Sequence, residues 1–396
     1  MRFFVKVSIA NTEIYKVIYL KKIKTPEITK VKVDRIAKVD RIDIEKTKTA
    51  LSMFLYGTIA MMAFCFVVSC KSSQVGETSK PDRITLADPS KDVPVKVDFT
   101  EVWAYYLTDA KHQNDLKDSF AAKITDIGYF GADVNTYGTL TDVPSRKKIS
   151  AKYTGRVHLV VTCSSYALTH FVLDPVSPIH RQLVKDLLAA AEDYDGLQID
   201  FELIPKRDGG TFLSFLNELR KGLGNKSLTV ALPARTKTIQ DDVYDYKNIG
   251  AVVDRIIVMA YDEHWSTSRP GPIASMRWCK NVGQYSLDTL GAEKLVMGVP
   301  FYGRTWGNVT TNKAYFHEGI MRINKEYREK ASDIKREDGI PMFTYEMTEK
   351  MTAYYDDAFS LTARLDMYKN MGITKTGFWC LGQEDPDFWK YLSVTK

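Results

Sequence analysis

The sequence has few cysteines and little net charge outside its N-terminal end. Three of its five cysteines lie beyond residue 70, namely Cys163, Cys279 and Cys380, and this odd number without metal-type spacing argues against a disulfide framework or a structural zinc site. We expect all three to be buried or partly buried thiols. The net charge is +6, but residues 1–52 carry 10 Lys and 3 Arg against 6 acids, or +7, which leaves −1 for the rest. The charge therefore gives no reason to expect a nucleic-acid partner.

Residues 1–52 also lack glycine, contain one proline and show no sustained helical period. These features indicate no particular fold for this basic N-terminal extension. Two interpretations remain open. The segment is a basic arm that binds an anionic surface, or the translation start is assigned too far upstream, and we favour the second.

The uncharged apolar run at residues 53–70, MFLYGTIAMMAFCFVVSC, is shorter than the roughly 20 residues that a membrane span requires. It has the length of a signal peptide and ends in small residues. Its last four residues resemble a bacterial lipobox, in which Cys70 would be lipidated; a membrane span is the alternative. Residues 71–97 contain three prolines and would form a flexible tether. We therefore expect an exported bacterial lipoprotein, anchored in a membrane by lipid, that faces the periplasm or the cell surface.

The remaining residues, 98–396, alternate between strand-like and helix-like segments. Helical patterns occur at 177–193, where Ser177 precedes Pro178 as a candidate N-cap, and at 211–224. The predicted strands cover residues 102–107, 126–134, 156–165, 194–203, 227–235, 254–265, 294–306 and 376–382.

Eight such strands with intervening helices predict an α/β fold, a (β/α)₈ TIM barrel with a short, charged insertion after strand 7, at residues 307–345. A doubly wound sheet is the alternative. The barrel is favoured because polar residues follow the C-terminal ends of many strands, whereas a doubly wound sheet concentrates its site at one switch point.

The segment YDGLQIDFEL, residues 194–203, places carboxylates in an otherwise apolar strand. Because side chains alternate along a strand, Gln198, Asp200 and Glu202 share one face, which must look into the barrel mouth. Asp200 and Glu202 lie about 7 Å apart along the backbone, so at least one should have a raised pKa and hold a proton near neutral pH. Such a carboxyl can act as a general acid. Asp195, at the strand entrance, is expected to be structural.

Neighbours on one strand face cannot flank a sugar from opposite sides, as the two carboxylates of most glycosidases do. If this is a glycosidase, its nucleophile must come from elsewhere. The stretch DGLQIDFE resembles the DG-x-D-x-D-x-E signature of glycoside hydrolase family 18, the chitinases and their relatives. Three further segments, VMAYDEHW, GVPFYGRTW and TGFWCLG, resemble the sixth, seventh and eighth strands of that family, so the resemblance covers about residues 98–396.

The resemblance implies a retaining, substrate-assisted hydrolysis of β-1,4 linkages next to N-acetylglucosamine. Glu202 would protonate the glycosidic oxygen, and Asp200 would orient the substrate's 2-acetamido group, whose carbonyl oxygen attacks the anomeric carbon. Tyr261 would hold the acetamido oxygen. We expect no cofactor.

Further residues are candidates for contact with the sugar. Trp379 would stack beneath the ring and Asp262 would contact the sugar near the scissile bond, while Tyr302, Arg304 and Trp103 are additional substrate-binding candidates. Trp379 as barrel filling, and Tyr302 and Arg304 as an ordinary strand terminus, are the alternatives.

Gln198 is also a candidate substrate-binding residue, and it departs from the family pattern. Most members have Asp at this position, where it shares a proton with the next acid, and Gln198 can hydrogen-bond Asp200 without accepting its proton. We therefore expect the pKa of Asp200 to be less perturbed than in those members. Amides occur at this position in active branches of the family, so the change does not imply inactivity.

His264 lies beside Asp262 and Glu263, but one short segment is not a coherent ligand set, so we predict no metal site. The segment 261–278 resembles the branch with spore-germination N-acetylglucosaminidases that act on peptidoglycan. Chitin oligomers, peptidoglycan and N-linked glycans all carry the required sugar, and the residues do not rank them. The expected partner is thus an N-acetylglucosamine polymer or oligomer bound by a monomer. The alternatives are a chitinase-like lectin, a barrel that serves adhesion, and an endo-β-N-acetylglucosaminidase.

Overall fold

The structure is a computed structural model that describes residues 2–9, 12–19, 93–107, 116, 118–309 and 312–395. The chain divides into two units, Met1–Asp82 and Arg83–Lys396. In the first unit, β1 (Arg2–Ile9) and β2 (Thr12–Tyr19) pair antiparallel. The predicted signal peptide, its Cys70 and most of the predicted tether lie outside the described residues.

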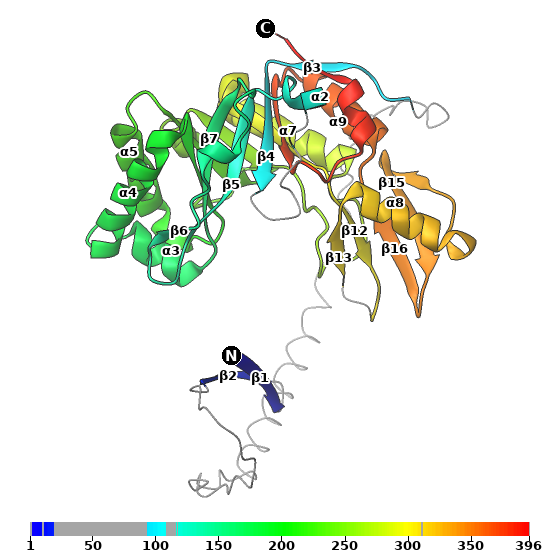
Figure 1. Cartoon of the computed structure of the whole chain (residues 1–396), viewed down its shortest axis with the longest axis horizontal. Coiled ribbons are helices and arrows are strands. Elements are labelled where there is room, and N and C mark those ends of the chain that lie inside the picture. The colour runs from blue at the N-terminus through cyan, green and yellow to red at the C-terminus, as the bar shows by residue number, and fades with distance from the viewer. Residues whose placement is uncertain are drawn as a thin grey trace, which may run out of the picture. The chain divides into compact units, whose positions relative to one another are not determined.

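The second unit is built on a closed parallel barrel, which confirms the predicted fold (Figure 1). The barrel is closed because its first strand pairs with both its second strand and its last strand. The short strand β6 (Leu140–Thr141) pairs antiparallel with the end of the second barrel strand. In chain order the eight barrel strands are β4 (Glu101–Leu107), β5 (Asp126–Val134), β7 (Arg156–Cys163), β8 (Gly196–Phe201), β9 (Ser227–Pro233), β10 (Arg255–Met259), β11 (Leu295–Pro300) and β17 (Lys375–Trp379).

Helices surround the barrel, and their caps follow the sequence signals. The Ser177 hydroxyl accepts a hydrogen bond from the Ile179 N–H at the start of α4, with Pro178 in the first turn, as predicted. The α-helices of the barrel are α2 (Asp118–Ala121), α3 (Tyr166–Leu173), α4 (Pro178–Ala190), α5 (Gly209–Gly222), α6 (Tyr246–Gly250), α7 (Met276–Lys294) and α9 (Ala358–Asn370). The 3₁₀ turns are η1 (Arg146–Lys148), η2 (Ala191–Asp193), η3 (Lys206–Asp208) and η5 (Pro386–Lys390), and β3 (Val97–Phe99) pairs with β18 (Leu392–Val394).

Charged residues occupy the N-terminal end of the barrel strands. Arg156 donates two hydrogen bonds to Asp126, at 2.7 and 3.0 Å, and His158 Nε2 lies 2.7 Å from Asp126 Oδ1. Arg255 pairs with Glu101. The Asp126 pairs join neighbouring strands and the Arg255–Glu101 pair joins strands far apart in the chain, so this end of the barrel is structural, and chemistry is left to the opposite end.

The insertion after the seventh barrel strand is larger than predicted and is folded. It comprises the antiparallel sheet β13-β12-β16-β15-β14 and one helix, at the lower right of Figure 1. Its own core includes Ile320, Phe343 and Met351. Its elements are β12 (Gly303–Trp306), β13 (Lys313–Tyr315), α8 (His317–Glu326), η4 (Arg328–Lys330), β14 (Lys335–Glu337), β15 (Ile340–Glu346) and β16 (Lys350–Tyr354).

The predicted seventh strand, 294–306, is therefore wrong as a single element. It divides after Pro300 into β11 of the barrel and β12 of the insertion, although the whole run is apolar enough to read as one strand. Gly303 permits the change of sheet, because a Cβ there would lie 2.6 Å from the Cβ of Tyr355 and 2.7 Å from the carbonyl oxygen of Tyr354.

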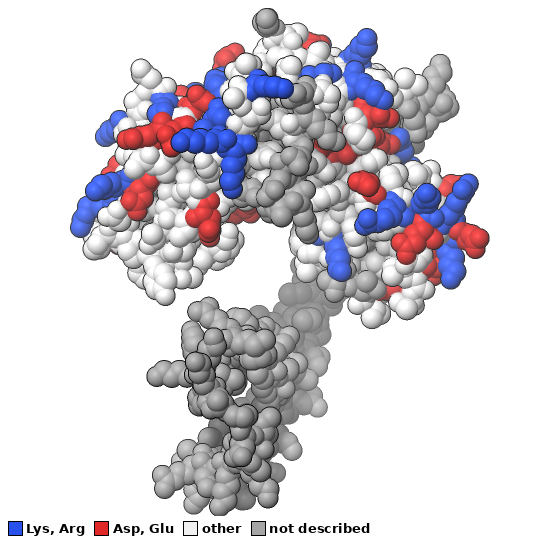
Figure 2. Space-filling view, in the orientation of Figure 1, with Lys and Arg blue, Asp and Glu red and all other residues white. Residues whose placement is uncertain are grey.

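The three described cysteines, Cys163, Cys279 and Cys380, are buried and form no disulfide within the described residues, as predicted. Within the described residues no helix is both long and apolar enough to cross a bilayer. Basic and acidic side chains are interspersed over the face of the second unit in Figure 2.

Candidate active site

The carboxylates of the segment 194–203 lie where the strand alternation predicted. Gln198 and Asp200 point into the barrel and are 0% and 5% exposed, whereas Glu202 follows the last residue of β8 and is exposed. The alternate apolar residues of β8 belong to the core cluster that includes helix residues of α4 and α5. Asp195 accepts a hydrogen bond from the Val157 N–H at 2.8 Å, which is the structural role expected of it.

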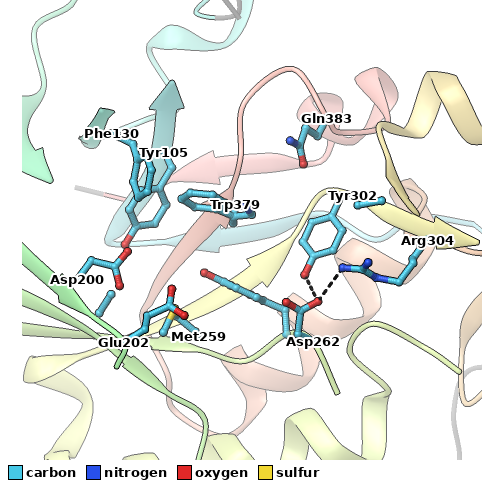
Figure 3. Close-up of a pocket in the computed structure, with 13 residues that line it drawn as sticks. Tyr105, Phe130, Asp200, Glu202, Met259, Asp262, Tyr302, Arg304, Trp379 and Gln383 are labelled. Atoms are coloured by element: carbon cyan, nitrogen blue, oxygen red, sulfur yellow. Dashed lines mark hydrogen bonds and ion pairs between the residues drawn. The ribbon is translucent and has the colours of Figure 1, made fainter. Parts of the chain in front are cut away.

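Asp200 and Glu202 both line a cavity of about 310 Å³ at the C-terminal end of the barrel (Figure 3). The cavity receives side chains from six barrel strands, from the insertion and from the loops that follow β10 and β17. Its lining residues are Tyr105, Phe130, Asp200, Glu202, Ala231, Met259, Tyr261, Asp262, Tyr302, Arg304, Ala314, Trp379 and Gln383.

The pKa values of the Asp200 and Glu202 carboxyls in the cavity are raised. Burial, together with the charge of Glu202, raises the pKa of Asp200 to about 8. Although Glu202 is exposed as a whole residue, partial desolvation of its carboxyl in the cavity wall and the nearby charge of Asp262 also raise its pKa. The prediction that at least one of the two carboxyls has a raised pKa is thus confirmed.

Gln198 lies below this cavity and does not line it, so the structure does not support direct contact with substrate. Its side-chain oxygen accepts from the Tyr105 hydroxyl at 2.6 Å, and its amide donates to the Thr229 hydroxyl at 3.0 Å. The expected bond to Asp200 is therefore absent among the described contacts, because both ends of the amide are engaged elsewhere. Asp200 Oδ1 is buried without a hydrogen-bond partner among the described residues.

Trp379 lies in the middle of the cavity, with aromatic rings beside it. Its ring centroid lies 5.1 Å from that of Tyr105 and 4.9 Å from that of Phe130, in tilted and edge-on geometries. Both rings were missed from the sequence. The signal for Tyr105 was available, because it stands two residues after Trp103 on the same strand face and nearer the barrel mouth.

Trp103 was the wrong member of that pair to assign to the substrate. It is 1% exposed, packs on His158 with ring centroids 4.4 Å apart, and donates from Nε1 to Glu101. It lies toward the N-terminal end of β4 and does not line the cavity.

The other wall of the cavity joins the loop after β10 to the insertion. The Tyr302 hydroxyl donates to Asp262 Oδ1 at 2.6 Å, and Arg304 lies 3.6 Å from the same oxygen (Figure 3). Tyr261 packs edge-on against Tyr302, with centroids 6.4 Å apart. Asp262 has φ of 57°, a left-handed conformation that costs free energy for a residue with a Cβ and that often marks functional sites. All four predicted residues therefore meet in one wall.

Asp262, Glu263 and His264 do not converge on one point. Glu263 accepts from the Ser275 N–H at 2.8 Å, and His264 Nδ1 donates to the Pro272 carbonyl at 2.8 Å, while Asp262 is engaged as described above. In the described part of the chain no group of three or more His, Cys, Asp or Glu side chains is arranged to hold a metal ion.

Comparison with protein-family models matches residues 176–384, more than half of the chain, to "Glycosyl hydrolases family 18". The chain belongs to glycosyl hydrolases family 18. The matched range contains the DGLQIDFE segment, the other three motifs and most residues of the cavity, so the family inferred from the motifs is confirmed.

Relatives of this family 18 chain include the "uncharacterized glycosylase YvbX" of Bacillus subtilis (strain 168). The two are 29% identical over 222 residues, which cover 52% of this chain and 62% of YvbX. The chain thus spans less than two thirds of that relative.

Two solved structures show the same fold. One is the Bacillus cereus spore cortex-lytic enzyme SleL, with a TM-score of 0.67 and 23% identity, covering 76% of each chain. The other is a chitinase from Chromobacterium violaceum, with a TM-score of 0.66 and 23% identity, covering 74% of this family 18 chain and 97% of the chitinase.

Proposed function

We propose that this protein is a retaining glycosidase that hydrolyses β-1,4 linkages next to N-acetylglucosamine, with the substrate's own acetamido group as nucleophile. The observation that carries the proposal is the position of Asp200 and Glu202. They line one cavity with Trp379, and the pKa of both carboxyls is raised. A protonated carboxyl beside an aromatic platform is suited to protonate the leaving oxygen of a stacked sugar.

In the first step the Glu202 carboxyl gives its proton to the glycosidic oxygen, and the bond from that oxygen to the anomeric carbon breaks. The acetamido carbonyl oxygen forms a new bond to the same carbon and yields an oxazolinium ion. Asp200 accepts a hydrogen bond from the acetamido N–H, which satisfies its buried, unpartnered oxygen. Tyr261 holds the acetamido oxygen. Glu202 then takes a proton from the water that opens the ring, so configuration is retained.

The substrate is proposed to be peptidoglycan or a chitin oligomer. The names of the two structural neighbours, a spore cortex-lytic enzyme and a chitinase, support this class. Hydrolysis of N-glycans remains an alternative, as does a lectin without turnover, although the presence of Glu202 favours the enzyme.

The decisive experiment incubates the protein with 4-methylumbelliferyl chitobioside, chitotriose, purified peptidoglycan and an N-glycopeptide. Glu202→Gln removes the acid while keeping the shape, and we expect the initial rate to fall by about 10²- to 10⁴-fold. Glu192→Gln, on the exposed η2 turn, is the matched control and should keep the wild-type rate. Binding without product from any substrate would instead indicate a lectin.

We also propose, from the sequence, a basic extension at residues 1–52, a signal peptide at 53–70, a lipid anchor on Cys70, a tether at 71–97 and a monomeric catalytic barrel at 98–396. Expression of the full chain in a bacterial host with labelled palmitate tests the anchor. Label should enter the wild type and be absent from Cys70→Ser. Size-exclusion chromatography with light scattering tests the monomer.

A further inference from the structure

Three buried polar atoms in the wall of the cavity lack a hydrogen-bond partner within the described residues. They are Asp200 Oδ1, Arg304 Nε and Gln383 Oε1. Buried polar atoms are nearly always paired, so an unpaired set gathered around one cavity needs an explanation. Asp200 has a role in the proposed mechanism, whereas Gln383 was not identified from the sequence and has none.

The backbone around Gln383 is held firmly. Its N–H donates to the Cys380 carbonyl at 3.2 Å, and its carbonyl accepts from the His317 N–H at 2.8 Å, at the start of α8. Gly382, with φ of 84°, donates its N–H to the Glu384 carboxylate at 2.7 Å. The turn therefore joins the barrel to the insertion and presents the Gln383 side chain to the cavity from a fixed backbone.

The unpaired atoms in the cavity wall suit the hydroxyl groups of a sugar. Arg304 Nε is an unpaired donor and Gln383 Oε1 is an unpaired acceptor in the wall of the same cavity. The Tyr302 hydroxyl cannot serve Gln383 while it donates to Asp262. A sugar hydroxyl can donate to Gln383 Oε1 and a sugar oxygen can accept from Arg304 Nε, whereas a carboxylate could not donate to Gln383.

We propose that Gln383 is a specificity-determining residue whose side-chain oxygen accepts a hydrogen bond from a hydroxyl of the sugar stacked on Trp379, with Arg304 donating to a sugar oxygen on the same side. Figure 3 shows Gln383 across Trp379 from Asp200, so the two residues address different edges of that sugar. This inference rests on the proposed function.

The contact restricts the sugar that fits. An N-acetylglucosamine linked through O1 and O4 has free hydroxyls at C3 and C6, and its acetamido group is assigned to Asp200 and Tyr261. Gln383 therefore selects a sugar with an unsubstituted hydroxyl at C3 or C6. An ether or ester at that oxygen would remove the donor and leave Gln383 Oε1 unpaired, which disfavours the modified sugar.

The test is a double-mutant cycle in which one change is made in the enzyme and the other in the substrate. The probe is 4-methylumbelliferyl chitobioside, together with analogues that lack the 3- or 6-hydroxyl on the sugar next to the leaving group. Gln383→Leu removes the acceptor, Gln383→Glu keeps an acceptor oxygen, and Gln182→Leu on the exposed surface of α4 is the matched control.

We expect Gln383→Leu to lower kcat/KM on the parent probe by about 5- to 100-fold, and Gln383→Glu to retain more activity than Gln383→Leu. With the wild type, kcat/KM on one of the two deoxy analogues should be lower than on the parent probe by a similar factor. With Gln383→Leu, kcat/KM on that analogue should be little lower than on the parent probe. The hydroxyl missing from that analogue is then the one that contacts Gln383. Equal effects of Gln383→Leu on all three probes, or no effect, would overturn the inference.

The same cycle separates this inference from the proposed function. If the wild type binds the probe but hydrolyses neither the probe nor chitotriose nor peptidoglycan, the proposed function fails, and the cycle is measured as Kd by calorimetry. If Gln383→Leu and the loss of one hydroxyl have non-additive effects on Kd, the contact between Gln383 and that hydroxyl would still be supported. A wild type that neither binds nor hydrolyses the probe, chitotriose or peptidoglycan would refute both.

Discussion

Replacement of Gln198 by Asp would introduce the acid of the DG-x-D-x-D-x-E signature in the interior of this barrel. Gln198 is fully buried and holds Tyr105 and Thr229 through its amide. Asp200 stands two residues away on the same strand face and is 5% exposed, with its pKa already raised to about 8. A second buried carboxyl at position 198 would therefore have to share a proton with Asp200.

The size of the pKa shift caused by Gln198→Asp follows from the distance between the carboxyls at positions 198 and 200. Two residues along a strand put the carboxyls about 7 Å apart. At an effective dielectric constant of about 20 the repulsion between two charges at that distance is about 2.4 kcal/mol, or about 1.7 pKa units. Fully water-like screening would reduce it to about 0.4 units. Because both positions are buried, we expect the last proton of the pair to leave about 1 to 2 pH units higher than in the wild type.

The direction of the change in the pH profile depends on which protonation state of the carboxyls is active. The proposed mechanism needs a proton on the carboxylates of the cavity, so activity falls as pH rises through their pKa. Gln198→Asp should therefore move the alkaline limb of kcat/KM against pH upward, measured with the fluorogenic chitobioside. Gln198→Asn is the control, because it has the shape of Asp without its charge and should leave that limb in place.

An alkaline limb that is the same for Gln198→Asp and Gln198→Asn, in variants that remain folded and active, would contradict this reasoning. It would mean that position 198 is not electrostatically coupled to the proton that limits turnover.

Three further predictions concern single side chains. Asp200→Asn should abolish activity but raise the free energy of unfolding at pH 9. Asp200 has a pKa of about 8 in the folded state, against an ordinary 3.8, so the free energy of unfolding of the wild type falls by several kcal/mol as pH rises from about 4 to about 8. Urea unfolding of the variant at a series of pH values should lose most of this pH dependence. Tyr302→Phe frees Asp262 and should lower kcat/KM by about 3- to 10-fold with little change in Tm. Trp103→Phe should lower Tm, through the lost bond to Glu101, and leave KM within about twofold; a large rise in KM would instead place Trp103 at the substrate.

The barrel and its acid pair could be predicted because both follow from local patterns. Each parallel strand is a short apolar run, and the polar residues that break the pattern at its end must face the mouth. The alternation in the segment 194–203 was sufficient to place Gln198 and Asp200 inside. Burial then fixes the direction of the Asp200 pKa shift without further information.

What could not be predicted depends on contacts between distant segments. The apolar run 294–306 is typical of one strand, and only the pairing of β12 with β13 and β16 shows that β12 belongs to another sheet. Ala314 and Gln383 enter the cavity because that sheet and the turn after β17 meet there. Trp103 failed for a related reason, since its depth in the barrel is set by register with neighbouring strands.

The cavity is thus built from two parts of the chain with different tasks. Asp200 is held by the barrel wall, far in sequence from the insertion, and its proton depends on burial there. The opposite wall depends on the insertion, because Tyr302 orients Asp262 and the His317 N–H fixes the turn that carries Gln383. A change in how the insertion packs would move those contacts together while the acid pair stays in place. The pKa of Asp200 and the choice of sugar are therefore separable properties of this fold, whereas the pKa of Glu202 also responds to Asp262 on the opposite wall.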